Sequence, residues 1–371
     1  MNEKPKKSRG LKYIALFVLA LAAVFCLWVG YKWFTRPRIS QIYLYGEGHG
    51  VPEYIDEEFE LWSQYYHEEG MRHLFVEYPY YTAELLNLWM NEKDDTILWQ
   101  WFGEIAGTQD AVQEKWDFFH RIKAECPETV FHGTDVGHQY QTTGVRYLAY
   151  LKEQGLADSE QYARAQEVME QGKYYYENSD SIYRENMMVE NFLTEYAALN
   201  GEDIMGIYGS AHVDPEGLDY YTQTVPCMAG QLKETYGEHL HTEFMEDLVG
   251  ENFPTLSQLE LPAEGETQSF NLGGKTYSAV CVGWQDIREL TGGQYLARVF
   301  WQLEEGAFAD FESARTTGAV LPYENFPVPV EEGQVFAADY IMFTGGTVRY
   351  YLRADGTLWE GVETTVGFWP V

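Results

Sequence analysis

Four apolar segments of this sequence run into side chains that can serve as acids, bases or metal ligands. The segments span residues 41–45, 73–76, 129–132 and 203–208. The residues they lead to are, in chain order, Glu47, His49, Glu77, Asp135 and His212. Glycines beside them let the backbone turn sharply and approach a ligand closely. Two copies of Gly-x-x-His, ending at His49 and His212, are hard to ascribe to turn chemistry alone.

This combination of residue types suits two kinds of hydrolytic chemistry. Imidazole nitrogen and carboxylate oxygen bind divalent transition metals, so we predict that His49, Glu77 and His212 hold such an ion, which activates a water molecule. Without a metal, a histidine acts as the base and a neighbouring carboxylate fixes its tautomer. The residue types alone do not decide between the two. Ser210 lies in Gly-Ser-Ala-His rather than Gly-x-Ser-x-Gly, which argues against a serine nucleophile.

Each residue also has a structural explanation. A single histidine after a strand is commonly a hydrogen-bonded structural residue. Glu77 can cap a helix or pair with Arg72, and Asp135 is of a type that favours turns and N-caps. The interpretation as a site therefore rests on the group as a whole.

The elements that must position these residues alternate along the chain from about residue 40 to 250. Between the apolar segments, four stretches place apolar residues at the three- and four-residue spacing of a helix, at 53–69, 82–92, 110–125 and 181–199. Such alternation predicts an α/β fold with a parallel-rich central sheet flanked by helices. Ligands of such sheets bind beyond the carboxyl ends of the strands, so the five residues are expected to converge in one crevice.

After about residue 250 the pattern changes to strands separated by glycine turns. The segment 268–286 predicts a hairpin, 295–303 a further strand, and 335–343 with 347–353 a second hairpin. We therefore predict three regions: a tail and anchor at 1–38, an α/β domain at 39–250 and a small antiparallel β module at 251–371. The β module shows no chemical constellation.

The N-terminal region predicts placement in a membrane. Residues 13–31 carry no charged side chain and, as a helix, nearly cross the hydrocarbon layer of a bilayer. The excess of basic residues before this stretch predicts a single-pass protein with a cytoplasmic N-terminus and an extracytoplasmic body. A cleaved signal peptide is the alternative, although its apolar region is usually shorter.

Composition excludes some functions. The chain of 371 residues holds 25 Lys+Arg against 58 Asp+Glu, a formal charge of -33. A surface of this charge repels phosphate backbones, so nucleic-acid binding is not expected. With 45% hydrophobic and 16% aromatic residues, the chain is expected to form a core rather than to be disordered.

At its reactive residues the chain resembles the superfamily that unites erythromycin esterase-like hydrolases, TIKI and TraB/PrgY-type membrane proteins and the haem-binding ChaN proteins. The resemblance covers roughly residues 40–245, and paired Gly-x-x-His motifs with an intervening glutamate are the pattern of the TIKI/TraB branch. That branch implies metal-dependent proteolysis. The stretch 184–191 is similar to an Arg- and Met-containing helix of the esterase branch, which implies that Arg184 faces the site. A surface arginine paired with Asp180 or Glu185 is the alternative. Gly209 stands where the esterase branch has a further histidine.

These observations predict a membrane-anchored extracytoplasmic hydrolase that cleaves a peptide or small ester with activated water. His49 and His212, with Glu77 and Glu47, would hold a divalent metal or activate water directly. Asp135 would orient a histidine or complete the ligand set, and Arg184 would stabilise oxyanion charge.

The alternative is a non-catalytic surface protein that sequesters haem, a metal or a peptide signal in the same crevice. Similarity to ChaN leaves haem open, but no motif here requires it. Two histidines in 238–241 are a further, weaker candidate pair. The sequence does not indicate the oligomeric state.

Overall fold

The computed structural model describes most of the chain beyond its N-terminal region. The described ranges are 40–105, 108–199, 201–250, 253–272, 275–311, 315–320, 330–356, 358–359, 362–363 and 365–369. The predicted membrane anchor at 13–31 lies outside them. Within the described ranges, the structure contains no helix with the length and apolar character needed to cross a membrane.

The first part of the fold is a five-stranded sheet with the order β3-β2-β4-β1-β5, in which every pairing is parallel. Its strands are β1 (Ile42–Glu47), β2 (His73–Pro79), β3 (Val130–Asp135), β4 (Ile204–Gly209) and β5 (Leu240–Phe244). The chain enters at β1, crosses to β2 and β3, and later inserts β4 between β2 and β1. The parallel-rich α/β fold expected for this region is therefore present.

Both faces of this sheet are buried. Successive residues of a strand point to opposite sides, and the residues on each side pack into a core cluster. On β2, Leu74 and Val76 pack into one core cluster and Phe75 packs into another. On β4, Met205 joins the first cluster and Tyr208 the second. Continuous apolar runs, rather than alternating ones, are the sequence signature of such strands.

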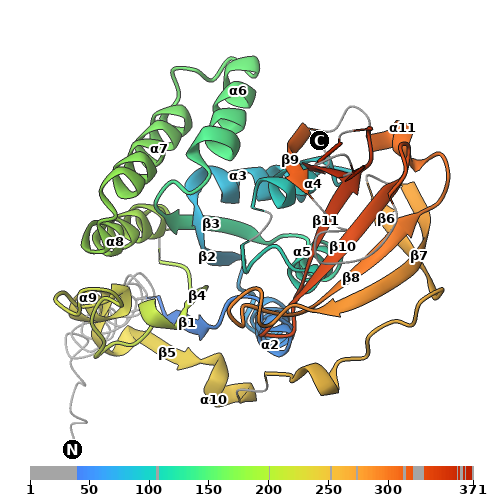
Figure 1. Cartoon of the computed structure of the whole chain (residues 1–371). Coiled ribbons are helices and arrows are strands. Elements are labelled where there is room, and N and C mark those ends of the chain that lie inside the picture. Colours follow the sequence, from blue (N-terminus) through green and yellow to red (C-terminus); the bar gives the residue numbers. More distant parts are fainter. Residues whose placement is uncertain are drawn as a thin grey trace, which may run out of the picture. The chain divides into compact units, whose positions relative to one another are not determined.

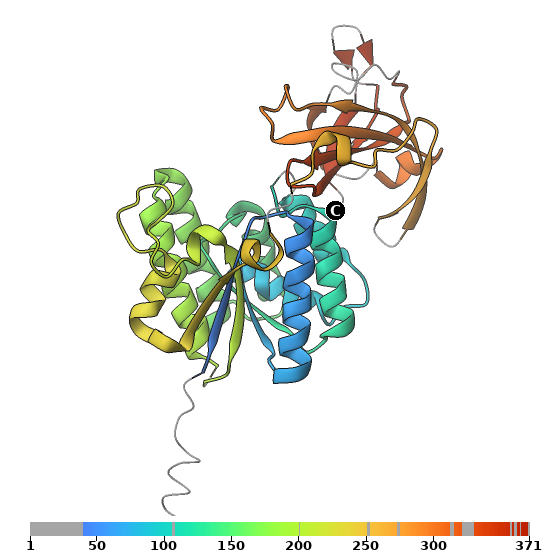
Figure 2. The same ribbon diagram turned by 90° about the horizontal axis from the view of Figure 1, so that it is seen from below.

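Helices cover the two faces. Figure 2 shows the strands between α2 and α5 on one side and the green helices, which include α8, on the other. The bounds of the helices in this region are α2 (Pro52–Gln64), α3 (Tyr80–Trp89), α4 (Thr96–Glu104), α5 (Gln113–Glu125), α6 (Val145–Glu153), α7 (Glu160–Asn178), α8 (Ser181–Ala197), α9 (Met228–Tyr236) and α10 (Met245–Val249). Short helical turns occupy Tyr65–Glu69, Tyr140–Gly144, Ser210–His212, Gly237–His239 and Leu256–Gln258.

A second, antiparallel sheet follows, drawn in orange and red in Figure 1. Its order is β6-β7-β8-β10-β11-β14-β9. The bounds are β6 (Thr267–Leu272), β7 (Lys275–Asp286), β8 (Tyr295–Leu303), β9 (Arg315–Val320), β10 (Val335–Met342), β11 (Thr347–Arg353) and β14 (Thr365–Trp369), with α11 at Ala307–Phe311 and a separate pair β12 (Leu358–Trp359) and β13 (Val362–Glu363).

The turn between β10 and β11 packs against the first part of the chain. Met342 and Val348, which flank it, belong to the same buried cluster as residues of α2 and α5. The hydroxyl of Thr344 donates a hydrogen bond of 3.0 Å to the carbonyl oxygen of Gly50. This contact brings the second sheet next to the loop that carries His49.

The predicted and the observed helices and strands differ mainly where the regular spacing of apolar residues is weak. The stretch 110–125 was expected to be helical throughout, but α5 starts at Gln113 and leaves Asp110 in the preceding loop. The strand β5 and the helices α4, α6, α7 and α9 were not predicted. The histidine pair considered as a functional candidate lies at the start of β5, where His239 and His241 both hydrogen-bond the side chain of Gln41.

A close backbone approach fixes the segment that follows β3. A side chain at Gly172 of α7 would place its Cβ 1.9 Å from the carbonyl oxygen of Gly137, which lies between Asp135 and His138. We expect Gly172→Ala to lower the free energy of unfolding by about 2 kcal/mol, because overpacking outweighs the better helix propensity of alanine. Chemical denaturation measures the change. Lys173→Ala, at an exposed position one residue on, is the control and should change stability by less than about 0.5 kcal/mol.

Candidate active site

The carboxyl ends of β3, β2, β4 and β1 meet at one edge of the parallel sheet. On neighbouring strands Glu47 lies beside Gly209, and Gly46 beside Tyr208. The loops and helices that follow these strands therefore project their side chains into a common volume. The structure brings together all six residues that the sequence suggested for catalysis.

Glu77, at the end of β2, lies at the centre of this group. Its Oε1 atom is 2.6 Å from Nη2 of Arg184, 3.4 Å from Nε2 of His212 and 4.0 Å from Nε2 of His49. Its Oε2 atom accepts a hydrogen bond from the backbone N–H of Gly209. Burial alone would raise the pKa of Glu77, but the charges of His212, Arg184 and His49 hold it well below its usual range. Glu77 is therefore a buried, ionised carboxylate.

Gly209 leaves little room for a side chain. A Cβ atom at this position would lie 3.1 Å from Nε2 of His49 and 3.3 Å from Oε2 of Glu77. The first residue of the second Gly-x-x-His motif is thus the point where the backbone of β4 passes directly beside the reactive side chains.

Arg184 is held in one orientation by two carboxylates. It lies in the first turn of α8, which Asp180 caps by accepting a hydrogen bond from the Tyr183 N–H. Nε and Nη2 of Arg184 donate to the two oxygens of Asp135 at 3.0 and 2.7 Å, and Nη2 also donates to Glu77. The arginine thus pairs with Asp135 and Glu77 rather than with Asp180 or Glu185. Nη1 is the nitrogen that these bonds leave for other partners.

His212 is backed by a carboxylate that the sequence analysis did not assign to the site. Its Nδ1 atom lies 3.0 and 2.9 Å from the two oxygens of Glu185, which is buried and also accepts a hydrogen bond from the Met228 N–H. Burial alone would lower the pKa of His212, but Glu77 and Glu185 raise it to about 10. Glu185 was considered only as a partner of its neighbour Arg184.

The Nε2 atom of His212 has one partner for each protonation state. It lies 3.4 Å from Nη1 of Arg184, which can only donate, and 3.4 Å from Oε1 of Glu77, which accepts. The protonated ring donates to Glu77, and the neutral ring accepts from Arg184. Proton gain and loss at this atom therefore require no movement of the ring.

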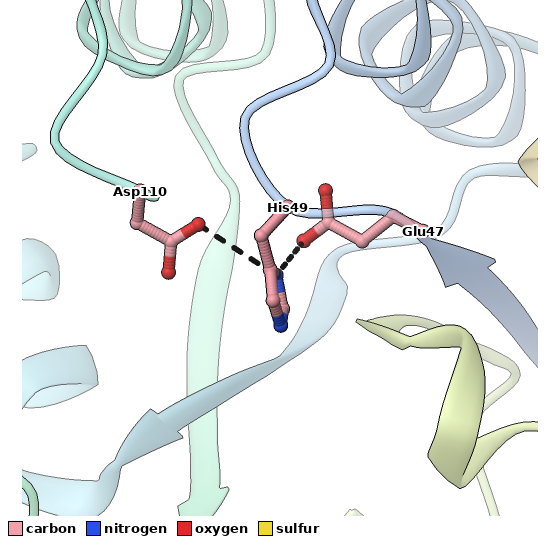
Figure 3. Close-up of side chains that lie close together, drawn as sticks. All are labelled: Glu47, His49 and Asp110. Carbon is pink, nitrogen blue, oxygen red and sulfur yellow. Dashed lines mark hydrogen bonds and ion pairs between the residues drawn. The ribbon is translucent and has the colours of Figure 1, made fainter. Parts of the chain in front are cut away.

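His49 lies between two carboxylates, as Figure 3 shows. Its Nδ1 atom is 3.1 Å from Oε1 of Glu47 and 3.7 Å from Oδ1 of Asp110. Burial alone would lower the pKa of His49, but Asp110, Glu47 and Glu77 raise it to about 10. Asp110 was missed in the sequence because it follows no strand and lies in the loop before α5.

A buried lysine, Lys115, lies beside Glu47, the carboxylate nearest to His49. Nζ of Lys115 is 3.0 Å from Glu58 and 3.6 Å from Glu47. Burial alone would lower the pKa of Lys115, but both carboxylates hold it well above its usual range. Burial, reinforced by Glu47, raises the pKa of Glu58 well above its usual range, although Lys115 opposes this shift.

The reactive side chains border two hollows. One, of about 530 Å³, is lined by His49, Glu77, Arg184 and His212. Its walls also include aromatic residues and the turn between β10 and β11, namely Tyr175, Tyr220, Tyr221, Phe253, Phe343 and Thr344. The other, of about 270 Å³, is lined by His49, Glu77 and Arg184 together with Asp110, Asp135 and His138. His49, Glu77 and Arg184 therefore face both hollows.

The donor sets for a metal differ in compactness. In the described part of the chain, one group of three side chains offers ligand atoms that all lie within 4.8 Å of one another, and it consists of Glu47, His49 and Asp110. The set predicted from the sequence, His49, Glu77 and His212, shares Glu77 with the guanidinium of Arg184, whose positive charge opposes a cation there. That set remains a prediction.

Other polar candidates have structural partners. Ser210 donates from its hydroxyl to the backbone oxygen of Glu47, which fits a structural role. His138 lies 2.8 Å from Asp135 and also contacts the Tyr176 hydroxyl. His73, the first residue of β2, and His132 of β3 contact each other away from the carboxyl ends of the strands.

Glu185→Gln tests the origin of the high pKa of His212. We expect the pKa to fall towards its usual value of 6.5, because one of the negative charges that raise it is removed. A raised pKa stabilises the folded state below pH 6.5, and this stabilisation disappears as the pH rises through about 10. The stability difference between wild type and variant should therefore be largest at acidic pH and shrink towards pH 10. NMR titration of the ring and denaturation between pH 6 and about pH 10 measure both quantities, and an unchanged ring pKa would contradict the assignment.

Lys115→Met tests the charge balance below His49. Removing the ammonium leaves the ionised Glu47 without its buried counter-charge, so we expect a loss of about 3–5 kcal/mol in the free energy of unfolding. The double variant Lys115→Met/Glu47→Gln should regain part of this loss. Lys152→Met, at an exposed position of α6, is the control. Equal stability of Lys115→Met and wild type would show that the buried lysine is not needed to balance Glu47.

Comparisons with known proteins find a partial likeness in fold. No family model matches the sequence, and no curated protein matches it significantly. One similar solved structure is a Bacillus cereus protein, with 13% identity, a TM-score of 0.42 and coverage of 56% of this chain and 65% of that one. A succinoglycan biosynthesis protein has 13% identity, a TM-score of 0.41 and coverage of 55% and 65%. A mutant of the erythromycin esterase EreC in its open conformation has 11% identity, a TM-score of 0.39 and coverage of 84% and 90%.

The first two of these matches cover just under two thirds of the partner structure. All three TM-scores and identities are low, so these likenesses do not assign a family. The arguments about function that follow therefore depend on the geometry of the site itself.

Proposed function

We propose that this protein is a hydrolase that cleaves an ester or amide bond with a water molecule activated in the cavity of about 530 Å³. The observation that carries the proposal is the position of His212 Nε2, 3.4 Å from both Arg184 Nη1 and Glu77 Oε1. A proton acceptor and a fixed cationic donor lie side by side at the wall of one cavity. Such a pair promotes hydrolysis of a carbonyl compound, because it can take a proton from water and stabilise charge on the carbonyl oxygen.

His212 is the general base of the proposed reaction. Glu185 accepts the Nδ1–H hydrogen, which fixes the tautomer whose Nε2 lone pair faces the cavity. Water bound there loses its proton to Nε2 as it attacks the substrate carbonyl. The resulting imidazolium then donates to Glu77, which already lies at hydrogen-bonding distance.

Arg184 stabilises the charge that develops on the carbonyl oxygen. Asp135 and Glu77 hold Nε and Nη2, so the guanidinium is oriented before the substrate arrives. A preorganised donor of this kind costs little reorganisation during the reaction. Nη1 is the nitrogen that faces the developing oxyanion.

His49 completes the site on the leaving-group side. The Nδ1 atom of His49 faces Glu47 and Asp110. Its Nε2–H therefore points towards Glu77 and towards the two hollows that His49 and Glu77 both line. This hydrogen can be donated to the departing oxygen or nitrogen. In a metal-dependent form of the reaction, a divalent ion bound by His49 and neighbouring carboxylates would polarise the carbonyl or lower the pKa of bound water.

The wider setting of the enzyme also belongs to the proposal. A membrane anchor at residues 13–31 would hold the site outside the cytoplasm, and a peptide or small ester would be its substrate. The aromatic walls formed by Tyr175, Tyr220 and Phe343 suit a substrate with an apolar body around the cleaved bond.

The experiment compares variants of the full-length chain in detergent on mixed ester and peptide libraries. His212→Gln should lower kcat by about 10²- to 10⁴-fold, which is the usual contribution of a general base. His120→Gln is the matched control, because His120 pairs with Asp95 at a partly exposed position outside both hollows. Equal turnover in His212→Gln and wild type would contradict the assignment of the base.

The pH profile gives an independent measurement. Because the base must be neutral and the pKa of His212 is raised to about 10, the rate should rise about tenfold per pH unit between pH 7 and about pH 9. Glu185→Gln should move this rise to lower pH. A wild-type rate that is flat over the range would exclude His212 as the base.

The competing function is ligand capture without turnover. It would be indicated if no ester or amide were cleaved while haem gave a Soret band, or a peptide bound, with an affinity that His49→Ala and His212→Ala both weaken. The same purified proteins serve for both experiments.

A further inference from the structure

Buried carboxylate oxygens near His49 receive few hydrogen bonds from their neighbours. Oδ1 of Asp110 is buried and lacks a hydrogen-bond partner among the described residues. Oε2 of Glu47 and Oε1 of Glu58 also lack a partner, apart from the hydrogen bond that these two side chains share. Lys115 lies closer to Glu58 than to Glu47, and His49 lies 3.1 Å from Glu47 and 3.7 Å from Asp110. Buried polar atoms are rarely left without a partner, so an additional cation or hydrogen-bond donor is expected here.

A small space lies among these groups. It measures about 10 Å³ and has apolar walls together with a polar lining made of Glu47, His49, Glu77, Tyr78, Asp110 and Lys115. A space of this size holds about one water-sized particle. Glu47, which is 5% exposed, lines it together with the side chain of Asp110, which is 21% exposed.

We infer that Glu47, His49 and Asp110 form a binding site for one divalent transition-metal ion. Oε1 of Glu47 and Oδ1 of Asp110 lie 3.1 and 3.7 Å from Nδ1 of His49, on two sides of the ring in Figure 3. A tetrahedral ion with bonds of about 2.0–2.2 Å separates its ligands by roughly 3.3–3.6 Å. The two separations from Nδ1 are close to this range, and the ligand atoms of Glu47 and Asp110 lie within 4.8 Å of each other.

The ligand types select the kind of ion. One imidazole nitrogen and two carboxylate oxygens suit zinc and similar transition metals better than calcium, which prefers six to eight oxygens. Three protein ligands leave a coordination position open. Access is available from the hollow of about 270 Å³, which both His49 and Asp110 line.

Lys115 limits the affinity without occupying the site. Its Nζ atom lies 3.6 Å from Oε2 of Glu47, whereas the ion would bind Oε1, the oxygen that faces His49. The nearby positive charge weakens binding of a second cation. The site differs from the set predicted from the sequence, since it uses neither Glu77 nor His212.

The test measures metal binding and does not require turnover, so its result is separate from that of the proposed hydrolase. The parent protein is the full-length chain with His239→Ala/His241→Ala, which removes a partly exposed histidine pair near Gln41 that could bind metal adventitiously. After chelation, Zn²⁺ is returned by equilibrium dialysis and bound metal is counted by mass spectrometry. Co²⁺ absorption reports the coordination geometry.

We expect one equivalent of Zn²⁺ in the parent and a loss of affinity of at least about tenfold in Asp110→Asn. Zn²⁺ should also raise the Tm of the parent but not that of Asp110→Asn. Because Asp110 lies in a partly exposed loop, this variant is expected to fold; Glu47→Gln provides a second ligand variant, and circular dichroism checks both. His212→Ala is the matched control and should bind as the parent does.

Three results would overturn the inference. The first is a parent that binds no metal, which would show that protons or water occupy the space. The second is unchanged affinity in a folded Asp110→Asn. The third is loss of the ion in His212→Ala, which would favour the set of His49, Glu77 and His212.

Discussion

An ionised carboxylate buried among cationic groups is the interaction on which the site depends. Glu77 keeps its charge because Arg184, His212 and His49 surround it. Arg184 also bonds Asp135, so one side chain of α8 joins the ends of β2 and β3. Burying these charges costs several kcal/mol each unless they are paired, so each partner fixes the position of the others. The arrangement of the reactive groups follows from this mutual requirement.

The sequence could predict the residues that follow strands. Glu47, His49, Glu77, Asp135 and His212 come after apolar runs, and parallel strands bring their carboxyl ends to one edge regardless of the loops between them. The predicted convergence of these residues rests on that rule, and the structure places them accordingly. Their roles in catalysis and the domain boundaries stay predictions.

Other parts of the site depend on tertiary packing, which leaves no recognisable pattern in the local sequence. Asp110, Lys115 and Glu185 come from a loop and from helices, and only the docking of α5 and α8 on the sheet brings them to the histidines. The aromatic wall is a similar case, because Phe343 belongs to a turn of the second sheet that showed no chemical pattern. The strand β5 was missed because its alternating, half-buried residues resemble an element boundary.

The hydrogen bond from Thr344 to Gly50 has a consequence for how the chain can be divided. It connects positions 294 residues apart and ends on the residue directly after His49. The same turn contributes apolar side chains to the core beside α2 and α5. A fragment that stops before the second sheet would lose one wall of the cavity and an anchor of the histidine loop. The walls of the cavity therefore extend into the C-terminal strands, even though the reactive side chains come from the parallel sheet, its loops and α8.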